Sequence, residues 1–151
     1  MHVAPTIRGV VRVLGLVCVL LVSVCTAHAA TVYDGSTPMQ CAIQNVMVCD
    51  NPMVCVRGTA ETINFPPSVK VDIGQRLISG AASGRTARIT AVNRDRGFLT
   101  MYGTESGAAG VGWAVSIAEG SGKMRGAVVG HEGGFLMFGA CAVADGGRPG
   151  G

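Results

Sequence analysis

The stretch MQCAIQNVMVCDNPMVC, Met39–Cys55, decides the fold, because it combines an alternating pattern with three of the four cysteines that follow residue 30. The apolar and sulfur-containing side chains share one parity, and polar side chains occupy the other. The first set is Met39, Cys41, Ile43, Met47 and Cys49, and the second is Gln40, Gln44 and Asp50. A two-residue period of this kind predicts a strand with one buried face, so we expect the sulfur atoms to lie in a core.

The segment that precedes this strand is typical of a secretory signal. Arg8 and Arg12 stand before a short apolar run that begins at Val13, and Ala27-His28-Ala29 places small residues where a signal peptidase cuts. The apolar run is shorter than the roughly 20 residues that a membrane span needs. We therefore predict a signal peptide over residues 1–30, membrane contact only through it, and a periplasmic or secreted protein.

The cysteines allow two interpretations, disulfide bonds or a copper site built from Met-x-Cys pairs. An even number of cysteines in an oxidising compartment favours disulfides. Cys41 and Cys49 would lie about 26 Å apart on one straight strand, too far for a bond. The turn signal Asp50-Asn51-Pro52 favours Cys49–Cys55, which leaves Cys41 with Cys141. On this interpretation we expect neither a metal nor a cofactor.

The rest of the chain also alternates in twos, and turn residues separate the alternating runs. The expected inward positions include Val69 and Val71, Ala87, Ile89 and Ala91, Trp113, Val115 and Ile117, and Met124, Gly126 and Val128. No window of a dozen residues shows helical spacing. These features predict an all-β domain over residues 31–142, a small antiparallel barrel or sandwich of about seven strands, followed by a disordered tail at 143–151.

The charge balance and the available histidine, cysteine and serine motifs exclude several classes of function. The chain has 12 Lys and Arg against 9 Asp and Glu, and two of the basic residues lie in the predicted signal, so nucleic acid is not an expected partner. After residue 30 the only histidine is His131, in the turn HEGG, and no Cys-x-x-Cys pair is present, so zinc has no ligand set. No serine lies in a nucleophile-elbow motif. We predict no catalytic residues and no enzyme activity.

Two resemblances to known proteins are carried by short motifs. The cysteine spacing at Cys41, Cys49 and Cys55, the strand led by Trp113 and the closing FGAC at 138–141 resemble short exported proteins of alphaproteobacteria that have no assigned function. Separately, Ala81-Ala82-Ser83-Gly84-Arg85 is similar to the Ser-Gly-rich loop of periplasmic inhibitors of c-type lysozyme. That resemblance implies a loop, Ser79–Arg88, that enters an enzyme cleft through Ser83, Gly84 and Arg85.

These observations support three functional hypotheses. The first is a non-enzymatic exported binding or structural module. The second is an inhibitor acting through the Ser79–Arg88 loop, for which an envelope protein is a candidate partner. The third is a carrier of an apolar ligand, in which Trp113 forms the floor of a pocket rather than part of the core. The carrier hypothesis requires that the interior of the barrel is not filled by side chains.

Overall fold

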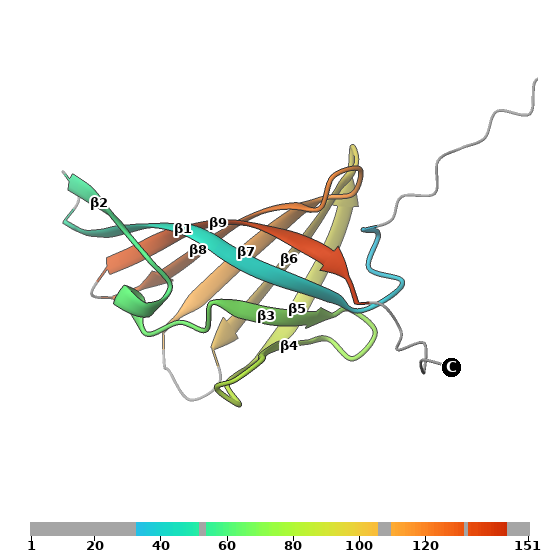
Figure 1. Cartoon of the computed structure of the whole chain (residues 1–151), viewed down its shortest axis with the longest axis horizontal. Coiled ribbons are helices and arrows are strands. Elements are labelled where there is room, and N and C mark those ends of the chain that lie inside the picture. Colours follow the sequence, from blue (N-terminus) through green and yellow to red (C-terminus); the bar gives the residue numbers. More distant parts are fainter. Residues whose placement is uncertain (1–32, 52–53, 106–109, 132, 145–151) are drawn as a thin grey trace, which may run out of the picture. The chain divides into compact units, whose positions relative to one another are not determined.

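A computed structural model describes residues 33–51, 54–105, 110–131 and 133–144, and within this part the protein is all-β (Figure 1). Nine strands follow one another, interrupted by one short 3-10 helix, η2 (Glu61–Ile63). They are β1 (Met39–Asn51), β2 (Val54–Gly58), β3 (Ser68–Asp72), β4 (Leu77–Gly80), β5 (Thr86–Asp95), β6 (Phe98–Glu105), β7 (Gly112–Ala118), β8 (Lys123–Gly130) and β9 (Gly133–Val143). The prediction of an all-β domain is confirmed.

The sheet closes into a barrel of antiparallel strands. The order is β2-β1-β3-β4-β5-β6-β7-β8-β9, and β9 also pairs with β1. β1 is long enough to have two partners on one edge, with Met39–Ala42 opposite β3 and Val46–Asn51 opposite β2. Eight strands therefore form the closed barrel, and β2 pairs only with β1, from which it projects (Figure 1). Of the two predicted architectures, the structure is the barrel, with two strands more than the seven expected.

A tight hairpin joins β5 to β6. Asp95 pairs with Phe98, so only Arg96 and Gly97 form the turn, and both have positive φ angles of 49° and 80°. A two-residue turn with this geometry matches the twist of the strands on either side. β5 continues as far as Asp95, immediately before this turn.

Two β-bulges change which residues face the core. The pairing shifts between Ile43 and Asn45 in β1, and again between Ile89 and Ala91 in β5. An extra residue in one strand reverses the parity of everything after it. The predicted burial of Met47 and of Ala91 is therefore wrong: Val46 is fully buried while Met47 is only partly buried, and Ala91 is exposed.

The buried core fills one half of the barrel, which we call the closed end. Its largest fully buried side chains include Met39, Ile89, Leu99, Met101 and Ile117. The disulfide between Cys41 and Cys141 belongs to the same cluster and joins the first barrel strand to the last. The β1–β9 seam is thus closed by backbone pairing and by a covalent bond, as the cysteine pattern predicted.

The second disulfide, Cys49–Cys55, lies at the other end of β1 and ties β2 to it. Cys55 is exposed and Cys49 is partly buried, so this bond is more accessible to solvent than the first. Both predicted pairings are confirmed. Disulfide bonds are compatible with an oxidising environment outside the cytoplasm.

The predicted domain limits are only partly within the described residues. The signal peptide and most of the tail lie outside them. At the C-terminal side, Val143 still belongs to β9, and the amide of Ala144 donates a hydrogen bond to the carbonyl oxygen of Pro38 at 3.0 Å. β9 therefore runs one residue beyond the predicted limit at 142, and the hydrogen bond of Ala144 follows it. No helix among the described residues is long and apolar enough to span a membrane.

Candidate functional site

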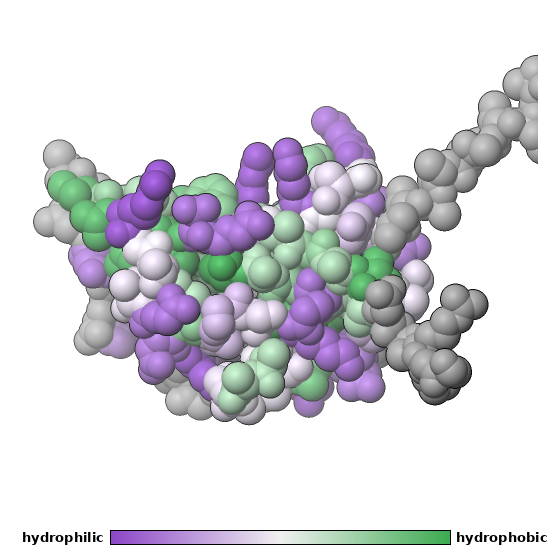
Figure 2. All heavy atoms as spheres, in the orientation of Figure 1, coloured by the Kyte–Doolittle hydropathy of each residue, from purple (hydrophilic) through white to green (hydrophobic). Residues whose placement is uncertain are grey.

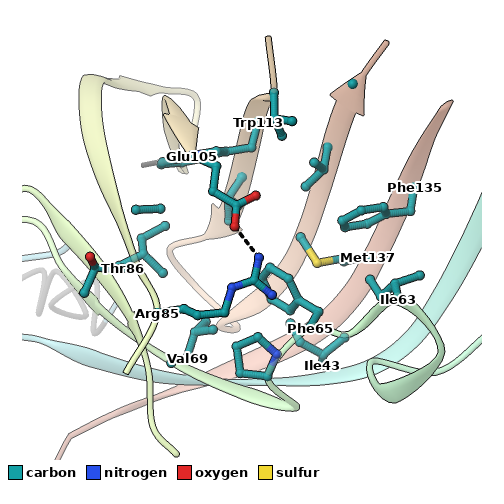
Figure 3. Close-up of a pocket in the computed structure, with 18 of the residues that line it drawn as sticks. Ile43, Ile63, Phe65, Val69, Arg85, Thr86, Glu105, Trp113, Phe135 and Met137 are labelled. Carbon is teal, nitrogen blue, oxygen red and sulfur yellow. Dashed lines mark hydrogen bonds and ion pairs between the residues drawn. The ribbon is translucent and has the colours of Figure 1, made fainter. Parts of the chain in front are cut away.

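A cavity of about 310 Å³ occupies the half of the barrel opposite the closed end (Figure 3). We call this half the open end. Here lie the turns between β4 and β5 and between β8 and β9, and the connection from η2 to β3. The walls are mainly apolar and include Ile43, Val69, Ile78, Val115, Val128 and Met137. Small residues also line it, among them Gly80 and Ala87.

Three aromatic side chains surround the opening of this cavity. Phe65 follows η2, Trp113 stands near the start of β7, and Phe135 stands near the start of β9. The rings of Phe65 and Phe135 meet edge to face, with their centroids 6.2 Å apart. An edge-to-face pair of this kind is a favourable aromatic contact, so these two rings stabilise each other's position in the cavity wall.

Trp113 owes its position to a glycine on the neighbouring strand. Gly103 of β6 is its pairing partner, and a Cβ at Gly103 would overlap the indole ring. The indole therefore occupies the space that a side chain at Gly103 of β6 would take. Its Nε1 is buried and has no hydrogen-bond partner among the described residues. A buried donor without a partner is uncommon in native proteins.

One side of the opening is polar. Arg85, immediately before β5, forms an ion pair with Glu105, at the end of β6, and its Nη1 donates a hydrogen bond to the carbonyl oxygen of Asn64 at 2.6 Å. Figure 3 shows the guanidinium and the carboxylate together at the cavity. Their side chains are 43% and 30% exposed, so the pair is screened by solvent and contributes little to stability. Arg85 does, however, connect the η2–β3 segment to β5 and β6.

The opposite side of the opening is apolar and continues onto β2. Phe135 pairs with Val48, and Val48 pairs with Val56, so these three side chains form one row on the same face of the sheet. Val54 lies two residues from Val56 and shares its face. Val54 and Val56 are 59% and 57% exposed. Figure 2 shows hydrophobic residues gathered at the end of the molecule where Figure 1 places β2.

The structure separates the site residues that the sequence had grouped in one loop. Ser83 and Gly84 lie at the exposed tip of the β4–β5 turn, and Gly84 has a φ of +65°. The Ser83 hydroxyl accepts a hydrogen bond from the amide of Arg85 at 3.3 Å. The Arg85 side chain turns back to the cavity instead of extending with Ser83, and Trp113 lines the same cavity. The part of the Ser79–Arg88 segment that is a loop is short, because Ser79 and Gly80 belong to β4 and Thr86 to Arg88 belong to β5.

Glu105, Phe65 and Phe135 line the cavity but were not predicted from the sequence as site residues. Glu105 stood in a glycine-rich stretch that gave no sign of a partner 20 residues earlier in the chain. Phe65 precedes Pro66-Pro67, which indicated only a break before a strand. The inward parity of Phe135 was available from the β9 pattern, but parity does not say whether an inward residue meets the core or a cavity.

Other chemistry has little support in the described part of the chain. There, no three side chains of His, Cys, Asp or Glu come together in a way that could hold a metal ion. His131 is exposed in the β8–β9 turn and also lines the cavity. The arrangement as a whole is an apolar chamber with the ion pair of Arg85 and Glu105 at its opening.

Comparison with known proteins adds no family to this description: no protein-family model matches the chain, and no curated protein matches it.

Proposed function

We propose that the protein is an exported, non-enzymatic binding module that holds a small apolar ligand in the cavity at the open end of its barrel. One observation carries the proposal: the barrel interior is packed at the closed end and hollow at the open end, where the walls are apolar. An interior that side chains do not fill is what the carrier hypothesis requires.

The cavity has the features of a ligand site in size and lining. Its volume of about 310 Å³ is at the lower end of the range of roughly 300–1,000 Å³ that is usual for small-molecule sites. Closed barrels of eight strands are wide enough to hold one small ligand. Each methylene group that leaves water for such a cavity contributes about 0.8 kcal/mol of favourable free energy.

Two observations indicate the compartment in which the protein binds its ligand. The signal-like segment at residues 1–30 predicts transfer out of the cytoplasm. The two disulfides are compatible with an oxidising compartment. We propose that the protein binds its ligand in the periplasm or outside the cell.

A fluorescence titration tests the proposed function. Trp113 is the only tryptophan of the chain and lines the cavity, so its emission reports on occupancy. We expect a saturable change in emission when 1-decanol is added to the purified protein with both disulfides formed. Ala87→Phe should weaken this binding by about tenfold or more, because Ala87 lines the cavity and the added ring fills it.

Ala91→Phe is the matched control. Ala91 lies on the same strand but is exposed on the outer surface of the barrel. It should change the affinity for 1-decanol by no more than about twofold, as expected for a surface substitution. An unchanged emission on addition of 1-decanol, or equal weakening by both variants, would refute binding in the cavity.

A further inference from the structure

We infer that the ligand is a single-chain amphiphile with a carboxylate head, bound with its chain in the cavity and its head at Arg85. The inference rests on the proposed function and adds the chemical class of the ligand and the residue that selects it.

The opening of the cavity is itself amphipathic. Arg85 and Glu105 lie on one side, and Phe135 lies on the other, where its apolar row continues away from the cavity through Val48 and Val56. The two sides come from strands far apart around the barrel, β5 and β6 against β9, β1 and β2. A ligand that fits both sides needs a polar end and an apolar body.

The depth of the cavity admits only the apolar part of such a ligand. The walls below the opening are aliphatic side chains and a thioether, including Ile43, Val69, Val115 and Met137. A charged group placed there without a partner would lose its hydration at a large cost in free energy. The head group must therefore stay at the opening, where Arg85 is partly exposed.

Arg85 already holds a carboxylate at this position, that of Glu105. The bond between Arg85 Nη1 and the carbonyl oxygen of Asn64 is independent of Glu105 and keeps the guanidinium at the opening when Glu105 moves away. A guanidinium also matches a carboxylate in shape and can bind it through two parallel hydrogen bonds. In this arrangement Glu105 is an internal competitor that occupies Arg85 until the head group of the ligand replaces it.

If Glu105 competes with the head group for Arg85, substitutions at the two residues should have opposite effects on the affinity for a carboxylate amphiphile. Removal of Arg85 should weaken the binding of a carboxylate amphiphile, whereas neutralisation of Glu105 should strengthen it. A neutral amphiphile of equal chain length should be insensitive to both changes. If the ion pair serves only to hold the strands together, neither substitution will distinguish the two kinds of ligand.

The experiment compares decanoate with 1-decanol by the emission of Trp113, below the concentration at which either probe aggregates. For Arg85→Gln we expect the affinity for decanoate to fall by about tenfold or more, because a charge-assisted hydrogen bond to the head group is lost. The affinity for 1-decanol should change little. For Glu105→Gln we expect about threefold or greater tightening of decanoate and no change for 1-decanol. Retained binding of 1-decanol shows that each variant is folded.

Two matched controls change the same charges elsewhere. Arg88→Gln alters an exposed residue three positions along β5, and Glu119→Gln alters a carboxylate whose ion-pair partner is Arg94. Both should leave the preference for decanoate as it is in the unchanged protein. If 1-decanol binds and decanoate binds no more tightly than 1-decanol, the inference is wrong and the proposed function stands. The same holds if Arg85→Gln and Glu105→Gln leave the ratio of the affinities for decanoate and 1-decanol unaltered. If neither probe alters the emission, both are wrong.

Discussion

Trp113 and Gly103 are directly paired across β6 and β7, and the absence of a side chain at Gly103 is what allows the indole to lie against the sheet. A Cβ at Gly103 would overlap the ring and would also meet the carbonyl oxygen of Arg88. One glycine therefore determines how the largest side chain of the cavity wall is placed, and through it the shape of the candidate site.

Gly103→Ala should both destabilise the barrel and disturb the cavity. Overpacking against a ring and a backbone atom typically costs about 1–3 kcal/mol of the free energy of unfolding. The displaced indole should also alter the affinity for 1-decanol. Urea denaturation and the Trp113 titration measure the two effects. Gly112→Ala is the control, because a Cβ there meets nothing within 4 Å; equal loss of stability in both variants would contradict this account.

The two disulfides should contribute unequally to stability. Cys41 and Cys141 are 100 residues apart, while Cys49 and Cys55 are 6 apart. The longer loop restricts the unfolded chain more, by about 2.5 kcal/mol in the chain-entropy model. The double variant Cys41→Ala with Cys141→Ala should therefore unfold at lower urea than Cys49→Ala with Cys55→Ala. The reverse order would show that Cys41–Cys141, at the seam between β1 and β9, is not the more stabilising of the two disulfides.

The buried methionines should behave as core residues and not as metal ligands. Met39 and Met101 are fully buried at the closed end. Volume-conserving replacement by leucine should cost less than about 1.5 kcal/mol in each case. Thermal denaturation measures the cost, and metal analysis of the purified protein should find no stoichiometric copper. Copper that disappears in Met→Leu variants, together with free thiols in the denatured protein, would instead favour a sulfur metal site.

The exposed Ser83 tip tests the inhibitor hypothesis. Arg85 is held by Asn64 and Glu105, so it is not presented together with Ser83. We therefore expect that the protein leaves the rate of c-type lysozymes unchanged, and that Ser83→Ala alters stability by less than about 0.5 kcal/mol. A turbidity assay of cell-wall hydrolysis decides the first point. Inhibition that is lost in Ser83→Ala would restore the hypothesis that the β4–β5 turn enters an enzyme cleft.

The sequence predicted the architecture well because its main signals are local. Alternation and turn residues indicated the strands, and the spacing of Cys41, Cys49 and Cys55, with the late Cys141, indicated both bonds and hence the closing seam. The bulges were not predicted, because one extra residue at Gln44 or Thr90 leaves no compositional mark while reversing the parity that follows.

The candidate site was predicted only in part, for a related reason. Alternation indicates that Trp113 and Phe135 point inward. Whether the interior is filled at a given level depends on the summed volumes of side chains from strands that are distant in the sequence. The pairing of Arg85 with Glu105 likewise depends on the register of β5 and β6. Gly103, opposite Trp113, becomes informative only when that register is known.

The methionine methyl groups offer the most direct test of the central claim, that a ligand enters the open end of the barrel. Met124 and Met137 line the cavity, whereas Met39 and Met101 are buried at the closed end and do not line it. In a spectrum of the protein labelled with carbon-13 at the methionine methyls, 1-decanol should shift the Met137 and Met124 signals in a saturable way and leave those of Met39 and Met101 in place. Saturation without any shift at Met137, or equal shifts at all four methyls, would contradict the account.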